Sequence, residues 1–218
     1  MEMSMVYSLL QPFIPKLLRR VGGIEGLENL PEHGPLIVAS NHVSYLEPAL
    51  LSLLVIQKTD QTVFSIAKIG VWKLFHALGL AGYIGLIPVD PKNKSASIDL
   101  CLAKLHDGFP VLIFPEGHRN FEQVLQKGKT GTARLALLSG VPVIPAGYIG
   151  PRGGSVVETV RHLTQYGDQI RIRFGTPLHF SRVPAEQLTY EQLQITTGTI
   201  MRAIAELSTM PYPYEKEK

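Results

Sequence analysis

Short apolar runs alternate with segments of helical periodicity along most of this chain. The runs that predict β-strands are 35–41, 62–68, 83–89, 110–117, 141–149 and 169–175. The segments that predict helices are 48–56, 70–79, 95–108, 129–139 and 185–207. Strands separated by helices are typical of an α/β fold, because each helix crosses from one parallel strand to the next. We therefore predict an α/β fold with a mixed, largely parallel sheet flanked by helices.

Special residues refine the ends of some of these elements. Glu47 is placed to be the N-cap of the helix that follows it, with Pro48 at the first helical position, where a missing N–H costs no hydrogen bond. Gly108 predicts the end of the helix that begins near residue 95. The run 169–175 alternates polar and apolar residues, so we expect an edge or half-exposed strand there.

The first twenty residues differ from the rest of the chain. They are mostly apolar from Met5 to Leu18 and carry cations at Lys16, Arg19 and Arg20. An N-terminal amphipathic helical segment of this kind can lie in a membrane interface with its cations at headgroup level. A helix packed on the domain's own core is an alternative that these residues leave open. We predict three parts: an interface helix over 1–20, a main domain over 21–210 and a polar tail over 211–218.

Composition narrows the classes of function. Charged residues make up 18% of the chain, below the usual value of about 25%, and the mean hydropathy is +0.12. A net charge of +3, without a basic run interleaved with aromatic residues, gives no support for nucleic-acid binding. No stretch reaches the roughly 18 to 20 apolar residues of a transmembrane helix. The single cysteine, Cys101, lies in a helical pattern and is expected to be a buried structural thiol, and no Cys/His cluster has zinc spacing.

Polar residues that can carry chemistry follow three of the predicted strands. Asn41 and His42 follow the first strand, Lys68 ends the next one, and the segment 116–119 follows LIFP. In parallel sheets, ligands bind at the carboxyl ends of the strands. This clustering predicts a site at one edge of the sheet.

His42 and Glu47 form the first candidate pair. Across a loop between strand and helix, Glu47 could hold the proton on one imidazole nitrogen and leave the other nitrogen free to accept a proton from a substrate hydroxyl. A loop histidine with satisfied hydrogen bonds is the alternative reading. The segment FPEGHRN (114–120) is the second signal: Arg119 offers a planar fork for an anion, whereas a tight turn with internal ion pairs would explain the same residues.

Several nucleophile and phosphate motifs are absent. KGKTG (127–131) resembles the end of a phosphate loop, but the required glycine is replaced by Gln123. The chain has no G-x-S-x-G nucleophile elbow and no HExxH motif.

Taken in order, the motifs resemble those of the glycerolipid acyltransferase family, whose best-known members act on 1-acylglycerol-3-phosphate. The similarity extends from residue 21 to about residue 178. The segments that carry it are GIEGLENLP (23–31), SNHVSYLEP (40–48), FSIAK (64–68), GLIPVD (85–90), VLIFPEGHR (111–119) and VPVIPAG (141–147). The family's pattern is NHxxxxD, a basic motif after a strand, FPEGTR and VPVxP.

The resemblance implies an O-acyltransferase that moves a fatty acyl group from acyl-CoA or acyl-carrier protein to the hydroxyl of a lysophospholipid. His42 would be the general base, with Glu47 in place of the family's aspartate, and no covalent acyl-enzyme would form. No cofactor or metal is implied, and the thioester is a co-substrate. The implied substrate-binding residues are Asn41, Lys68, Glu116, Gly117 and Arg119.

Three positions depart from the family's pattern. Glu47 replaces aspartate, His118 replaces the threonine of EGTR, and Pro91 stands where an arginine is usual. The alternatives are therefore the same chemistry on a lyso-aminolipid or another alcohol, and a non-catalytic lipid-binding protein of the same fold. In each case the resemblance implies lipid partners, a membrane surface and a peripheral or monotopic position on the cytoplasmic face of a membrane.

Overall fold

The computed structural model describes residues 14–77, 85–89, 94–153 and 156–214. Strands in this part of the chain form one sheet in the order β1-β7-β6-β2-β5-β3-β4. Neighbouring strands run parallel except β6 and β7, which are antiparallel. The strands are β1 Gly23–Glu25, β2 Ile37–Ser40, β3 Phe64–Lys68, β4 Leu86–Val89, β5 Val111–Ile113, β6 Val143–Ile149 and β7 Arg171–Phe174. The predicted α/β fold with a mixed, largely parallel sheet is confirmed.

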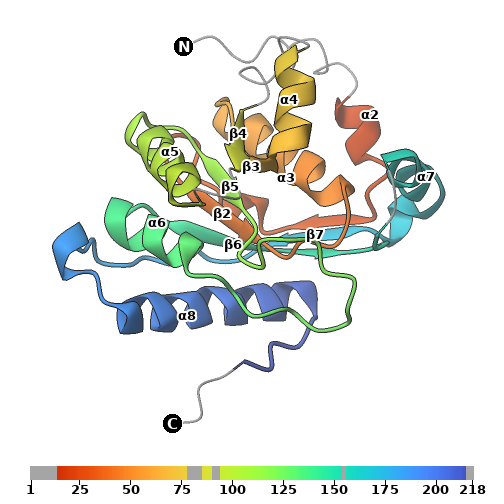
Figure 1. The fold of residues 1–218 in the computed structure, drawn as a ribbon. Coiled ribbons are helices and arrows are strands. Elements are labelled where there is room, and N and C mark those ends of the chain that lie inside the picture. The colour runs from red at the N-terminus through yellow and green to blue at the C-terminus, as the bar shows by residue number, and fades with distance from the viewer. Residues whose placement is uncertain (1–13, 78–84, 90–93, 154–155, 215–218) are drawn as a thin grey trace.

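Helices cover both faces of the sheet (Figure 1). They are α2 Ile14–Leu18, α3 Leu46–Thr59, α4 Ile69–Ala77, α5 Lys94–His106, α6 Gly131–Ser139, α7 Val156–Tyr166 and α8 Tyr190–Ser208, with short 3₁₀ turns at Leu27–Asn29, Gly167–Gln169 and Ala185–Gln187. Helices α5, α6 and α8 contact one another in succession, and α8 lies along β6 on the side opposite to α3.

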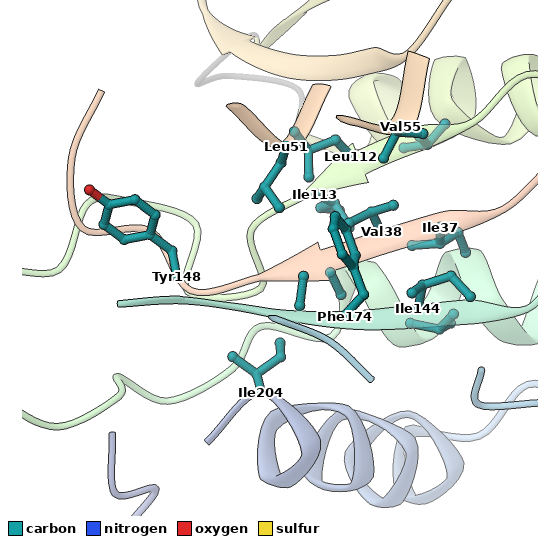
Figure 2. Packing of buried hydrophobic residues seen from close by; sticks show 14 of the residues in the cluster. Ile37, Val38, Leu51, Val55, Leu112, Ile113, Ile144, Tyr148, Phe174 and Ile204 are labelled. Carbon is teal, nitrogen blue, oxygen red and sulfur yellow. The ribbon is translucent and has the colours of Figure 1, made fainter. Parts of the chain in front are cut away.

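The central strands are apolar because both of their faces are covered. Every residue of β2 and β5 is buried, as expected of strands between two helical layers. Figure 2 shows Val38 and Leu112 on the side of the sheet where Leu51 of α3 lies, while Ile204 of α8 lies on the opposite side. Burial of such a side chain stabilises the fold by roughly 1.5 to 3 kcal/mol, so this core fixes the strand ends that carry the candidate site.

Some predicted boundaries differ from the structure. Helix α3 begins at Leu46, so Glu47 and Pro48 lie inside its first turn and Tyr45 is the N-cap. The predicted N-cap role of Glu47 is therefore wrong, because its side chain bonds to the preceding loop instead of starting the helix. Strand β7 has the predicted alternating burial, but it is not an edge strand, because β1 pairs with it.

The apolar pattern predicts neither strand β1 nor helix α7. Strand β1 is only three residues long, and α7 is a polar surface helix. Neither has the long apolar run that identifies a buried element.

The first and last described segments both contact the main domain. Leu18 of α2 packs against the core, while residues 1–13 of the predicted interface helix lie outside the described residues. At the start of the segment predicted to be a polar tail, the carbonyl of Pro211 accepts a hydrogen bond from Leu125 N at 2.9 Å, and the Tyr212 side chain packs on the core. None of the described helices is long and apolar enough to cross a bilayer.

Candidate active site

The candidate site lies where β2 and β5 end. These neighbouring parallel strands bring His42 and Phe114 together, and their rings stack with centroids 4.3 Å apart and an interplanar angle of 24°. The side chain of His42 keeps 19% of its surface exposed. The imidazole is therefore fixed by ring packing and still reachable from solvent.

Glu47 orients this imidazole. Its Oε1 lies 2.6 Å from His42 Nδ1, and its side chain is fully buried. The same carboxylate accepts hydrogen bonds from the backbone N–H groups of Val43 at 2.8 Å and Ser44 at 3.1 Å. Because the carboxylate is the acceptor in these contacts, we assign the Nδ1 proton to His42 as donor, which leaves Nε2 as a proton acceptor. The predicted approach of the two side chains is confirmed.

Ser44 completes the turn and was not predicted. Its hydroxyl donates to Glu47 Oε2 at 2.5 Å and accepts from Leu46 N at 2.9 Å. The residue thus ties the carboxylate to the start of α3.

Asn41 is turned toward the sheet. Only 1% of its surface is exposed, its Nδ2 donates to the Tyr148 carbonyl at 3.0 Å, and its Oδ1 accepts from Tyr148 N at 2.8 Å. These bonds join the end of β2 to β6. The placement favours a role in fixing the neighbouring His42 over the predicted contact with substrate.

Tyr148 lies beyond the end of β2 (Figure 2). Burial and, to a lesser extent, the negative charge of Glu47 raise the pKa of the Tyr148 hydroxyl, against the opposing effect of its hydrogen bond with Ser44. The hydroxyl therefore stays protonated beside the carboxylate.

Glu116 connects the segment 114–120 to the turn that carries His42. Its buried carboxylate accepts hydrogen bonds from His42 N at 3.1 Å, Gln126 N at 2.9 Å and Asn120 Nδ2 at 2.6 Å. Asn120 N in turn donates to the His42 carbonyl at 2.6 Å. The carboxylate points inward, so we expect Glu116 to position the loop, whereas the family resemblance implies that it binds the acceptor's phosphate.

Gly117 and Lys129 lie together on the outer side of this loop. Gly117 has a φ of 73°, a conformation that side chains disfavour. A Cβ there would lie 2.9 Å from Lys129 Cδ and 3.0 Å from Cε and would also meet the ammonium group, so the lysine side chain runs across the glycine. Within the described ranges, no carboxylate forms an ion pair with Lys129. Lys129 was missed because KGKTG was assessed only as a phosphate loop.

Arg119 lies against two aromatic rings. Its Cζ is 3.9 Å from the centroid of Tyr45 and 5.4 Å from that of Phe121. The neighbouring His118 is exposed, and its Nε2 lies 2.8 Å from Gln126 Oε1. Arg119 therefore approaches the turn that carries His42, as the interpretation of FPEGHRN requires.

Lys68 is the last residue of β3 and is exposed. Strand β5 separates β3 from β2, and all three run parallel, so Lys68 emerges at the same edge of the sheet as His42. Pro91, the third departure from the family's pattern, lies outside the described residues. No group of three or more metal-ligating side chains occurs in the part of the chain that the structure describes.

Comparison with known proteins connects this geometry to a family. The model of a family described as acyltransferase matches residues 23–149. A chloroplastic 1-acyl-sn-glycerol-3-phosphate acyltransferase of Brassica napus is 33% identical over 165 residues, which cover 73% of this chain and 45% of that protein. A 1-acyl-sn-glycerol-3-phosphate acyltransferase of Bacillus subtilis is 27% identical over 195 residues, or 85% of this chain and 88% of that protein.

A solved structure supports the same fold. The 1-acyl-sn-glycerophosphate (LPA) acyltransferase PlsC of Thermotoga maritima matches with a TM-score of 0.56 and 21% identity, over 90% of this chain and 79% of that one. The matched region is less than half of the length of the plant relative. The activity of this chain is therefore inferred from its own site.

Proposed function

From the premise that the chain belongs to the glycerolipid acyltransferase family, we propose that it transfers a fatty acyl group from a thioester to the free hydroxyl of 1-acylglycerol-3-phosphate, giving phosphatidic acid. The observation that carries this proposal is the 2.6 Å contact between His42 Nδ1 and Glu47, beside a loop that presents Arg119 and Lys129. A base and an anion site side by side fit an acceptor that has both a hydroxyl and a phosphate.

His42 acts as the general base. Its Nε2 removes the hydroxyl proton while the acceptor oxygen attacks the thioester carbonyl carbon. The carbon–sulfur bond then breaks, and the proton held by His42 passes to the leaving thiolate, so the base is regenerated. Glu47 stabilises the imidazolium that forms between these steps, because a buried carboxylate in contact favours the charged ring.

The acceptor's phosphate binds on the outer side of the loop that follows β5. Arg119 supplies a planar fork, and Lys129 supplies a second cation beside the exposed backbone of Gly117. Lys68 adds positive charge from the neighbouring strand end. Glu116 and Asn41 do not contact the substrates in this mechanism. The Glu116 carboxylate holds the loop in place, and the Asn41 amide holds the end of β2.

The donor is an acyl thioester of coenzyme A or of acyl-carrier protein, and the enzyme acts at a membrane surface as a peripheral or monotopic protein. The apolar N-terminal segment with its terminal cations supports this placement. A vesicle flotation assay of the full chain and a variant that lacks residues 1–20 tests it, because the truncated protein is expected to remain with the soluble fraction.

The test of the activity measures thiol release from acyl-CoA and from acyl-carrier protein, with and without 1-acylglycerol-3-phosphate. Wild-type protein should release thiol only with acceptor present, and mass spectrometry should find phosphatidic acid. His42→Ala should lower the rate by about 10² to 10⁴ while thermal unfolding stays close to that of wild type. Acceptor-dependent release at the wild-type rate in His42→Ala would contradict the mechanism.

Phosphate-free acceptors distinguish the alternatives. Transfer to a lyso-aminolipid or alcohol, but not to 1-acylglycerol-3-phosphate, would identify a different acceptor for the same acyl-transfer reaction. No transfer to any acceptor with either donor would leave a lipid-binding protein of this fold.

A further inference from the structure

Tyr45 lies in the turn between His42 and Glu47, and it is not among the residues assigned to catalysis or to substrate binding. It is the N-cap of α3, within the turn that joins His42 to Glu47. Although 42% of its surface is exposed, its ring lies under the Arg119 guanidinium, with Cζ 3.9 Å from the ring centroid. A cation at this distance over an aromatic face is attracted by the ring's quadrupole.

The backbone turn that carries Tyr45 is held by the same contacts that orient the base. Ser44, its neighbour, bonds to Glu47 through both its backbone and its hydroxyl. The carbonyl of Val43 accepts from Gly153 N at 2.7 Å, and Ser44 forms a parallel bridge with Gly153. The turn that carries Tyr45 is therefore braced from two sides.

Phe121, two residues after Arg119, places a second aromatic ring near the guanidinium. Its ring lies 5.4 Å from Arg119 Cζ and would lie 3.6 Å from a Cβ at Gly153. Arg119 thus meets aromatic rings from the braced turn and from its own loop. A guanidinium whose face rests on a ring keeps its N–H donors in the plane, directed away from that ring.

We propose that Tyr45 is a positioning residue, whose ring holds the Arg119 guanidinium so that its edge meets the acceptor's phosphate at a fixed distance from His42. This inference rests on the proposed function. Loss of the ring removes the nearer of the two aromatic contacts that order the long arginine side chain before the acceptor binds, and any ordering left until binding lowers affinity. The ring thus couples the anion site to the base turn without touching either substrate.

Steady-state kinetics with 1-acylglycerol-3-phosphate tests the proposal in four variants: Tyr45→Leu, Tyr45→Phe, Arg119→Ala and the double variant Tyr45→Leu/Arg119→Ala. Tyr45→Leu should raise the KM of the acceptor roughly 3- to 30-fold with little change in kcat. Tyr45→Phe, which keeps the ring, should stay within about 2-fold of wild type. The double variant should have the same KM as Arg119→Ala alone, because Tyr45 acts through that residue.

Tyr190→Leu is the matched control, since Tyr190 is an exposed tyrosine at the start of α8. Its KM should equal that of wild type. An unchanged KM in Tyr45→Leu, an equal defect in Tyr45→Phe, or a further rise in the double variant would each overturn the positioning role. If Arg119→Ala itself leaves KM unchanged, the phosphate site of the proposed function fails instead, and the two failures are thereby distinguished.

Discussion

The turn at 42–47 and the loop at 116–129 handle charge in opposite ways. In the turn, the Glu47 carboxylate is fully buried and surrounded by hydrogen-bond donors from residues within five positions of it. In the loop, the Glu116 carboxylate is turned inward while Arg119 and Lys129 remain on the outer side. The turn fixes one atom, His42 Nε2, whereas the loop presents positive charge over an area.

The two segments should therefore differ in the substitutions that they tolerate. Proton transfer requires contact distances, so the enclosed turn should be sensitive to a single atom. Attraction of a phosphate by several cations falls off more gradually with distance, so the loop should lose affinity in steps as cations are removed.

Glu47→Gln should lower activity more than any other substitution considered below except His42→Ala. An amide cannot stabilise the imidazolium as a carboxylate does, so kcat should fall on the order of 10² to 10⁴, the range of general-base catalysis. Thiol-release kinetics measures it. Glu47→Asp is the control, because it keeps the charge and shortens the side chain, and it should retain more activity than the glutamine variant. A glutamine variant with wild-type kcat would show that the turn does not orient a base.

Arg119→Ala should act on binding. Loss of a charged fork should raise the KM of the phosphate-bearing acceptor about 10- to 100-fold, with a smaller change in kcat. The KM of Arg119→Lys should fall between those of wild type and Arg119→Ala, since lysine keeps the charge but loses the bidentate geometry. Equal KM values for all three proteins would mean that the loop does not contact the phosphate.

A smaller effect is expected of Lys129→Gln. Because Lys129 is exposed, its attraction for phosphate is screened by water and salt, and KM should rise only about 2- to 5-fold at low ionic strength. The difference from wild type should shrink as salt is added. A change that is independent of salt would indicate that Lys129 acts by packing over Gly117 and not by its charge.

Substitution of Cys101 is expected to have almost no effect on activity. Burial raises the pKa of its thiol to about 12, so at a pH near 8 the thiolate that would react is scarce. A disulfide reagent should label the native protein only after unfolding, and Cys101→Ala should change kcat by less than about 2-fold. Rapid labelling of native protein would contradict the burial of α5 against the sheet.

Prediction from the sequence succeeded where contacts are local or periodic. The α/β sheet followed from alternating apolar runs, and the approach of Glu47 to His42 followed from a short loop between strand and helix. The N-cap assignment failed because a glutamate near a helix start can bond backward to the loop as readily as forward to the helix.

The rest depends on contacts between distant segments. The family resemblance implies that Asn41 binds substrate, but its amide forms hydrogen bonds with the backbone of Tyr148, more than a hundred positions away. The Tyr45 ring contacts Arg119, and the Lys129 side chain contacts Gly117, only in the folded chain. No spacing in the sequence predicts either contact. The tail shows the same limit, since Pro211 meets Leu125 only in the folded chain.

Cooperation between the base and the anion site can be measured by comparing kcat/KM for 1-acylglycerol-3-phosphate with kcat/KM for the monoacylglycerol that has the same acyl chain. We expect wild-type protein to prefer the phosphate-bearing acceptor on the order of 10-fold or more, Arg119→Ala to lose that preference while still using the phosphate-free acceptor, and His42→Ala to be inactive with both. Equal use of the two acceptors by wild-type protein, or undiminished transfer by His42→Ala, would contradict a base and an anion site working together.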